Sequence, residues 1–388
     1  MNFIEFLKKE ITNIKKINRY RFLREISSLP NETIILNGKK VLNLCSNNYL
    51  GLSGHPKLIK AEIEYAKKYG CGSTGSRLIT GTLTPHIELE EAVAKLKGTE
   101  KAIIFNTGYM ANIGVIDALT DENDVIFSDE LNHASIVDGC RISKAKKVIY
   151  KHCDLNNLED LLKKYKNVRN KLIVTDTVFS MDGDIAPLQD INFLAKKYNA
   201  ILMTDDAHAT GILGKNGGGG GEFFNLQEEI DIQMGTFGKA LGTFGAYIAG
   251  KKELIEYLIN RARPLIYTTA LPPGIIGATL KAIEIVKSEE GKLRRKLLFK
   301  KAEYLRRRLK EKGFNTLNSC TQIIPILIGD EKTTMKITER LLKNGIYVQG
   351  IRPPTVPQNM CRLRISVTVP VELDFKRLKG SKEQRSKD

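Results

Sequence analysis

The chain has 388 residues, 42% hydrophobic and 27% charged, values typical of a globular protein with a large core. It contains no run of 18 or more apolar residues and no signal-peptide core, which argues against a membrane span and favours a cytoplasmic protein. The net charge of +17 would suit a nucleic-acid-binding protein. Lysine and arginine are, however, spread along the chain without a nucleic-acid-binding motif, which argues against that function.

Residues 1–44 predict an amphipathic N-terminal helix and a connecting segment. Residues 45–280 then alternate short apolar strands with helical stretches, a pattern typical of a mostly parallel sheet covered on both faces. We therefore predict an α/β fold with a large domain at 45–280. Its seven predicted strands are 102–105, 124–127, 147–150, 171–176, 200–205, 231–235 and 245–250.

Residues 281–375 predict a smaller C-terminal α+β domain, and residues 376–388 a polar tail. The elements predicted in and around this domain are a helical run at 276–312, a strand at 322–329, a helix at 333–345 and a strand at 361–369. Five consecutive glycines at 217–221 indicate a flexible loop on composition alone.

The six cysteines are widely scattered, with no CxxC pair and no Cys/His cluster at metal-ligand spacing. This distribution favours reduced thiols in a cytosol, most of them small core residues, and predicts no metal site. The cysteines are Cys45, Cys71, Cys140, Cys153, Cys320 and Cys361.

Three strand ends carry groups suited to pyridoxal phosphate (PLP), and sites in open α/β sheets form at the carboxyl ends of strands. Asp205 could keep the pyridine nitrogen of PLP protonated, because a nearby carboxylate favours the charged ring. Lys239, between small residues in TFGKALG, could form the Schiff base with the cofactor. Alone each signal is weak, since a strand-end aspartate is often only a helix N-cap.

The cofactor's phosphate and ring need partners of their own. Gly108 and Tyr109, where a helix is expected to begin, could supply backbone N–H groups to the phosphate, and Thr236 a hydroxyl. His133, after the strand at 124–127, could stack on the ring. The residues alone therefore indicate that PLP-type carbanion chemistry is plausible, and no more.

Six segments carry a resemblance that goes further. They are SNNYLGL (46–52), GCGSTGSRLITGTLTPHIELE (70–90), DELNHASIVDG (129–139), VFSMDGDIAPL (178–188), DDAHATGILG (205–214) and TFGKALG (236–242). Together they resemble the α-oxoamine synthases, whose members have the aminotransferase-like fold type I of PLP-dependent transferases. The resemblance runs from about residue 20 to 375, nearly the whole chain.

This resemblance implies a role for each matching residue. Lys239 would carry PLP and act as acid and base, Asp205 would pair with the pyridine nitrogen, and His133 would stack on the ring. The cofactor would also meet His208, at its phenolic oxygen, and Ser180. Arg364 would hold the amino-acid carboxylate, and Asn47 would contact the substrate. Arg21 and Arg352 would help to position the acyl chain, although either could be an ordinary surface charge.

The family also implies a homodimer, in which Thr268 and Thr269 would reach the phosphate of the neighbouring subunit. Within the family, the segments IRPPTVPQNMCRLRISVT (351–368) and IYTTALPP (266–273) favour the members that condense L-alanine with a pimeloyl thioester in biotin synthesis. The donor thiol, coenzyme A or acyl carrier protein, stays open. The alternatives are glycine C-acetyltransferase activity and, remotely, a non-catalytic basic protein that binds nucleic acid.

The chain departs from the family pattern in three places. Asn48 stands where the family usually has Asp. The loop at 214–222 lacks an arginine that many relatives place there, so any anchoring by that side chain is expected to be missing. After residue 375 the sequence turns polar where relatives continue with an apolar helix.

Overall fold

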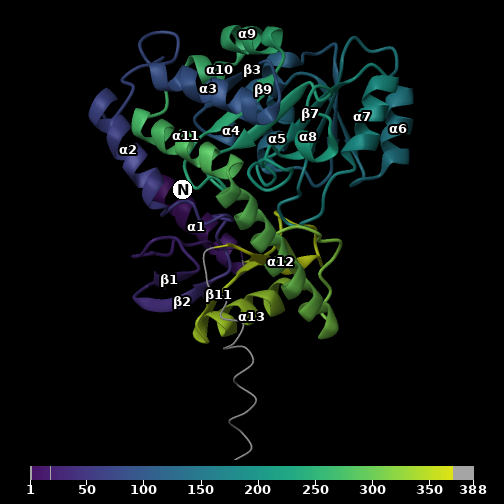
Figure 1. Ribbon diagram of the computed structural model, residues 1–388. Helices are drawn as coiled ribbons and strands as arrows, with labels where there is room; N and C mark the ends of the chain where they lie inside the picture. Colours follow the sequence, from purple (N-terminus) through teal and green to yellow (C-terminus); the bar gives the residue numbers. More distant parts are fainter. Residues whose placement is uncertain (1, 18, 370–388) are drawn as a thin grey trace, which may run out of the picture.

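A seven-stranded sheet forms the centre of the larger part of the molecule in the computed structural model, which describes residues 2–17 and 19–369 (Figure 1). Each strand lies within two residues of a predicted strand. The strands are β3 (Lys101–Phe105), β4 (Val125–Asp129), β5 (Lys146–Tyr150), β6 (Lys171–Asp176), β7 (Ile201–Asp205), β8 (Ile232–Thr236) and β9 (Ala246–Gly250). Their spatial order is β3-β9-β8-β7-β6-β4-β5, and only β9 runs antiparallel to its neighbours. The mostly parallel sheet is confirmed.

Helices cover both faces of this sheet, because its apolar side chains point alternately to either side. In β6, Leu172 and Val174 join the cluster under one group of helices, whereas Ile173 joins the cluster on the opposite face. The first face carries α4 (Gly108–Leu119), α5 (Ala134–Ile142) and α9 (Lys252–Arg261). The other carries α3 (Thr84–Lys97), α6 (Leu155–Lys164), α7 (Leu188–Lys197) and α11 (Pro273–Lys287). The remaining helices of this part are α2 (Pro56–Tyr69), which packs against α11, and the short α8 (Gly220–Phe224) and α10 (Arg263–Ile266).

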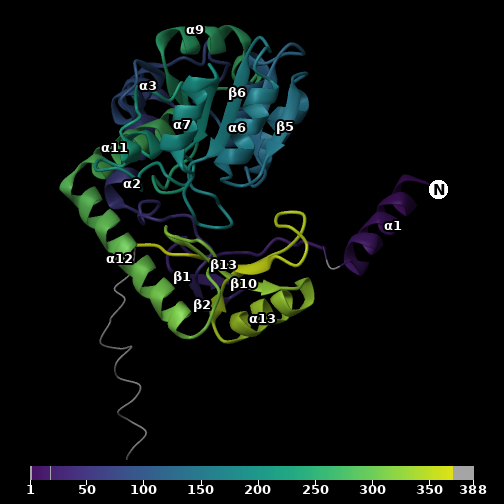
Figure 2. The ribbon, with the colours of Figure 1, turned by 90° about the vertical axis from the view of Figure 1, so that its right-hand side faces the viewer.

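A smaller α+β part follows, as predicted. The helical run predicted at 276–312 is two helices, because α11 ends before Ser288 and a new helix begins after it. The second helix, α12, lies along both parts of the molecule (Figure 2). The elements here are α12 (Glu289–Glu311), β10 (Ile323–Gly329), α13 (Glu331–Lys343), β12 (Gln349–Ile351) and β13 (Cys361–Ser366). β13 is the central strand of the antiparallel sheet β10-β13-β12.

The last part of the connecting segment predicted within residues 1–44 is not a simple connection, because it forms two strands. β1 (Thr33–Leu36) and β2 (Lys39–Asn43) form a hairpin, and β2 also pairs with β11 (Ile346–Tyr347). Asn37 and Gly38 make the turn with φ of 47° and 76°, as expected for an Asn-Gly hairpin loop. The N-terminal segment therefore shares a sheet with the C-terminal part.

The amphipathic N-terminal helix is confirmed as α1 (Phe3–Lys16). It buries none of its residues and extends away from the two main parts of the described structure (Figure 2). Among the described residues no helix combines the length and the apolar character needed to cross a membrane. The predicted tail at 376–388, and the end of the predicted small domain from residue 370, lie outside the described residues.

The glycine loop at 217–221 is buried and closely packed, contrary to the flexible loop expected from its composition. A Cβ on Gly219, whose φ is +92°, would lie 2.2 Å from a carboxylate oxygen of Asp206. Arg295 of α12 donates to the carbonyl of Lys215 at 2.5 Å, so a helix arginine contacts the loop that lacks its own. Composition gave no sign of these neighbours, which come from distant parts of the chain.

Candidate active site

A cavity of about 300 Å³ lies at the carboxyl end of the parallel strands. Six of the residues singled out in the sequence line it: Asn47, His133, Ser180, His208, Lys239 and Arg364. The remaining lining residues are Cys45, Met181, Gln349 and Ile351. The chain therefore brings β-sheet loops and the C-terminal sheet together around one hollow, as expected for an α/β site.

Lys239 follows β8 and is half-buried at the edge of this cavity. Among the described residues its ammonium has no hydrogen-bond or ion-pair partner. Burial lowers the pKa of Lys239 to about 8, although the carboxylates of Asp205 and Asp176 raise it and Arg364 lowers it. Near neutral pH the protonated form still predominates, but more of this amine is unprotonated and nucleophilic than of an ordinary lysine.

Asp205, at the end of β7, is buried and held by two donors. Asn112 Nδ2 of α4 and the backbone N–H of Ala207 each donate to one of its carboxylate oxygens at 2.8 Å. Asn112 was missed in the sequence, because a polar residue inside an apolar helix gives no local sign of its partner. Its buried Oδ1 has no hydrogen-bond partner in the described structure.

Asp176, at the end of β6, is a second buried carboxyl group that the sequence reasoning missed. It accepts a hydrogen bond from the backbone N–H of His133 at 2.8 Å. Burial, together with the nearby Asp205, raises the pKa of Asp176 well above its ordinary value. The signal was available, since the predicted strand KLIVTD ends in aspartate as its neighbour AILMTD does.

The two candidate histidines occupy different environments. His133 is the N-cap of α5, and its Nδ1 lies 2.7 Å from Ser135 Oγ. His208 is buried, with Nδ1 2.7 Å from the hydroxyl of Tyr49. Burial lowers the pKa of both rings, and for His208 the cations of Lys239 and Arg364 lower it further. His208 is therefore neutral at physiological pH.

Gly108, Tyr109 and Thr236 meet at the N-terminus of α4. A Cβ on Gly108 would lie 2.7 Å from Thr236 Cγ2, so any larger residue here would force the Thr236 side chain to shift. The Thr236 hydroxyl is buried and has no hydrogen-bond partner among the described residues. A free hydroxyl beside helix N–H groups suits a phosphate, so these residues fit the expected cofactor. The Tyr109 ring points elsewhere, because its hydroxyl donates to Asp138.

Arg364 on β13 is buried, and its guanidinium is spread over several acceptors. Its Nε donates to the Ser180 carbonyl at 2.5 Å, and Nη1 and Nη2 each lie 3.3 Å from Asn47 Oδ1. Ser366 Oγ accepts from Nη1 at 2.7 Å. The segment carrying Asn47 and the turn carrying Ser180 therefore meet at this one side chain.

Eight residues predicted for the site do not line the cavity: four are described above, Gly108, Tyr109, Asp205 and Thr236, and the others are Arg21, Thr268, Thr269 and Arg352. Thr268 is half-buried in a separate hollow beside Asn106, and the neighbouring Thr269 accepts a hydrogen bond from Asn106 Nδ2 at 2.7 Å through its carbonyl. Arg352 donates to the carbonyl of Tyr20 at 3.2 Å, which places it next to the exposed Arg21.

Known proteins resemble the chain over nearly its whole length. The family model for aminotransferase class I and II matches residues 39–374. The chain belongs to this family. A curated 8-amino-7-oxononanoate synthase of Geobacter sulfurreducens is 51% identical over 358 residues, 92% of both chains.

Solved structures of related enzymes have the same fold as this chain. A serine palmitoyltransferase of S. paucimobilis, with bound PLP–myriocin, matches with a TM-score of 0.91 and 31% identity, covering 98% of this chain and 96% of that one. An 8-amino-7-oxononanoate synthase of Francisella tularensis matches with a TM-score of 0.75 and 30% identity, covering 86% and 94%. The predicted aminotransferase-like fold type I is confirmed.

Proposed function

We propose that the chain condenses L-alanine with a pimeloyl thioester, with loss of carbon dioxide, to give 8-amino-7-oxononanoate for biotin synthesis. Its curated relatives at 46–51% identity carry the name of that synthase. The observation that carries the proposal is the half-buried Lys239 amine, whose pKa of about 8 lies within reach of neutral pH. It lies in a cavity that also holds Arg364.

PLP is the cofactor of the proposed reaction, and when bound it supplies a ring that withdraws electrons from a carbanion at the amino-acid Cα. Lys239 would hold it covalently, with Asp205 at the pyridine nitrogen. His133 would lie against the ring, and His208 near its phenolic oxygen. The N–H groups of Gly108 and Tyr109 and the free Thr236 hydroxyl would bind the phosphate. Ser180 would line the cofactor pocket.

The substrate would be bound and deprotonated by this chain's own side chains. The Arg364 guanidinium would hold the alanine carboxylate, since a planar fork of donors suits a carboxylate. Asn47 Oδ1 lies against both of its terminal nitrogens and would fix its orientation. Once freed, the Lys239 amine would remove the Cα proton and later return one, which a pKa of about 8 permits in both directions.

The acyl donor would enter from the side of the N-terminal segment. Arg352, which bonds the backbone at Tyr20, and the adjacent Arg21 would help to place its acyl chain. The donor thiol is coenzyme A or an acyl carrier protein. We further propose a cytoplasmic homodimer, in which Thr268 and Thr269 complete the phosphate site of the neighbouring subunit.

A thiol-release assay tests this function. The PLP-loaded protein is incubated with L-alanine or glycine and with pimeloyl-CoA, pimeloyl-acyl carrier protein or acetyl-CoA. We expect release only with alanine and a pimeloyl donor, and none from the Lys239→Ala variant. Preference for glycine with acetyl-CoA would establish glycine C-acetyltransferase activity instead. A colourless protein that binds DNA with a steep salt dependence would contradict any enzymatic reading.

A further inference from the structure

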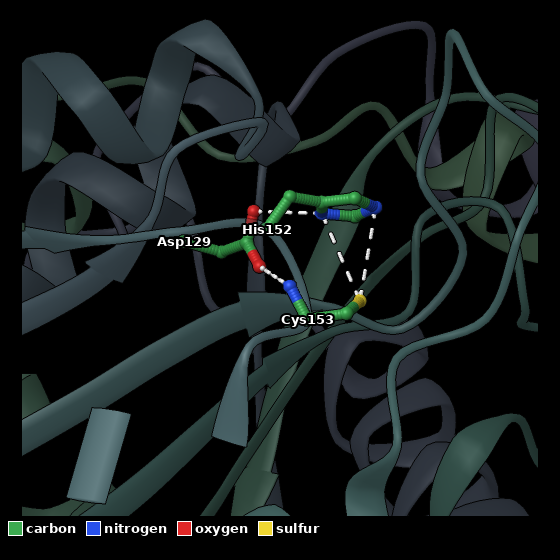
Figure 3. Close-up of side chains that lie close together, drawn as sticks. All are labelled: Asp129, His152 and Cys153. Atoms are coloured by element: carbon green, nitrogen blue, oxygen red, sulfur yellow. Dashed lines mark hydrogen bonds and ion pairs between the residues drawn. The ribbon is translucent and has the colours of Figure 1, made fainter. Parts of the chain in front are cut away.

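His152, which follows β5, bridges two acidic side chains outside the cavity. Its Nδ1 lies 3.0 Å from Asp129 Oδ1 and its Nε2 lies 2.8 Å from Asp184 Oδ2. Figure 3 shows the ring beside Asp129 and Cys153. The Cys153 sulfur lies 3.7 Å from each ring nitrogen. The ring also packs edge-on against Phe179, with centroids 4.4 Å apart. This geometry fixes the imidazole from three sides.

The group has the composition of a metal site, but a proton fits it better. Asp129, His152 and Cys153 offer ligand atoms within 4.8 Å of one another. Both ring nitrogens, however, already face carboxylate oxygens. Hydrogen bonds to Asp129 and Asp184 outweigh burial and raise the pKa of His152 to about 12, so a metal would have to displace a firmly held proton.

Each carboxylate that His152 contacts belongs to a segment forming part of the cavity wall. Asp129 ends β4 and accepts from the backbone N–H of Leu131 at 2.9 Å, two residues before His133. On the other side, Asp184 closes the turn 179–184, since its carbonyl accepts from the N–H of Phe179 at 3.1 Å.

The turn 179–184 reaches the C-terminal sheet. Its Ser180 carbonyl accepts from Arg364 Nε, and Asp182 pairs with Arg362 at 2.6 Å. A Cβ on Gly183 would lie 2.0 Å from the Ile323 carbonyl oxygen, so turn and sheet are in close contact. A displacement of Asp184 would therefore be transmitted to Arg364.

We propose that His152 is a positioning residue, whose bridge between Asp129 and Asp184 holds the turn 179–184 and, through it, the Arg364 guanidinium in place to bind the amino-acid carboxylate. This inference rests on the proposed function, because it assigns that carboxylate to Arg364. His152 does not line the cavity and touches no reacting atom.

The proposal is tested by measuring the dissociation constant of the PLP-loaded protein for alanine. Binding is monitored through the change in cofactor absorbance. We expect His152→Gln and Asp184→Asn to raise the dissociation constant for alanine by about 10- to 100-fold, because a hydrogen bond to a charged group contributes about that much to binding. Cofactor absorbance before alanine is added should not change. His152→Lys, which keeps a cation between the carboxylates, should recover part of the affinity, and Cys153→Ser should match the wild type. Dissociation constants within twofold of the wild type for both first variants would overturn the proposal.

A second readout needs neither cofactor nor alanine. The sequence contains five histidines, so the ring nitrogens of ¹⁵N-histidine-labelled protein can be assigned by substitution. At about pH 8, where an ordinary imidazole is neutral, we expect the His152 ring to carry both protons. A neutral ring, or one that binds added Zn²⁺ at micromolar concentration, would overturn the bridge itself. If wild-type protein fails to respond to alanine while this ring is doubly protonated, the proposed function fails and the bridge stands.

Discussion

Replacing Lys97 by methionine is the most direct test of how the strand-end region is held together. Lys97 of α3 and Asp206 are both fully buried and form an ion pair. The Lys97 ammonium also donates to the Gly218 carbonyl. The Asp206 carboxylate further accepts from the Thr177 hydroxyl and the Gly220 N–H. The pair thus joins α3, the residue after Asp205 and the glycine loop.

Removing the cation leaves a buried carboxylate with only neutral donors. Breaking a buried ion pair on one side costs about 3–5 kcal/mol, because the remaining charge is uncompensated. We expect Lys97→Met to lose this much stability, even though methionine fills a similar volume. Lys97→Met combined with Asp206→Leu should recover part of the loss, because no charge is then left buried.

Chemical denaturation of the cofactor-free protein measures the effect, with each transition analysed separately because a chain of this length need not unfold in two states. The matched control is Lys95→Met, an exposed lysine on the same helix, expected to change stability by no more than about 0.5 kcal/mol. A loss below about 1 kcal/mol for Lys97→Met would refute the reasoning, since the charge at Asp206 would then be tolerated without its partner.

Three further predictions concern the site and its loop. Cofactor attachment to Lys239 should speed up as pH rises, with a midpoint near its lowered pKa of about 8, because only the neutral amine attacks; an unchanged rate between about pH 7 and 9 would contradict this. Thr236→Val should weaken PLP binding by about tenfold. It should not destabilise the cofactor-free protein, because the Thr236 hydroxyl has no hydrogen-bond partner among the described residues. Calorimetry of the cofactor-free and PLP-loaded proteins would measure both effects. Gly219→Ala should lower the melting temperature, because its Cβ would collide with Asp206, whereas Gly72→Ala, with open space around it, should not.

The sheet could be predicted from the sequence because its strands are short, apolar and separated by amphipathic helices. Local pattern does not reveal pairing between distant segments, so the hairpin β1–β2 and its contact with β11 were missed. The Asn37-Gly38 dipeptide is the local signal of this hairpin, since both residues adopt the positive φ that such a turn requires. The packing of the glycine loop cannot be predicted from its composition, because composition carries no information on the buried residues that surround it.

In the candidate site, too, residues marked by a local pattern could be predicted, whereas residues placed by long-range contacts could not. Residues at strand ends and in the resembling segments, such as Lys239 and Arg364, do meet in one cavity. Residues that hydrogen-bond to the site residues or to their neighbours, without lining the cavity, could not be predicted from the sequence. Asn112 lies within an apolar helix and Asp184 within a turn, and neither pattern indicates that the side chain faces a buried carboxylate or an imidazole.

The central claim is that the ε-amine of Lys239 forms the covalent link to PLP. Borohydride treatment of the PLP-loaded protein fixes such a link, and peptide mapping by mass spectrometry then locates it. We expect the reduced cofactor on Lys239 alone. A label on another lysine, or none at position 239, would contradict the account.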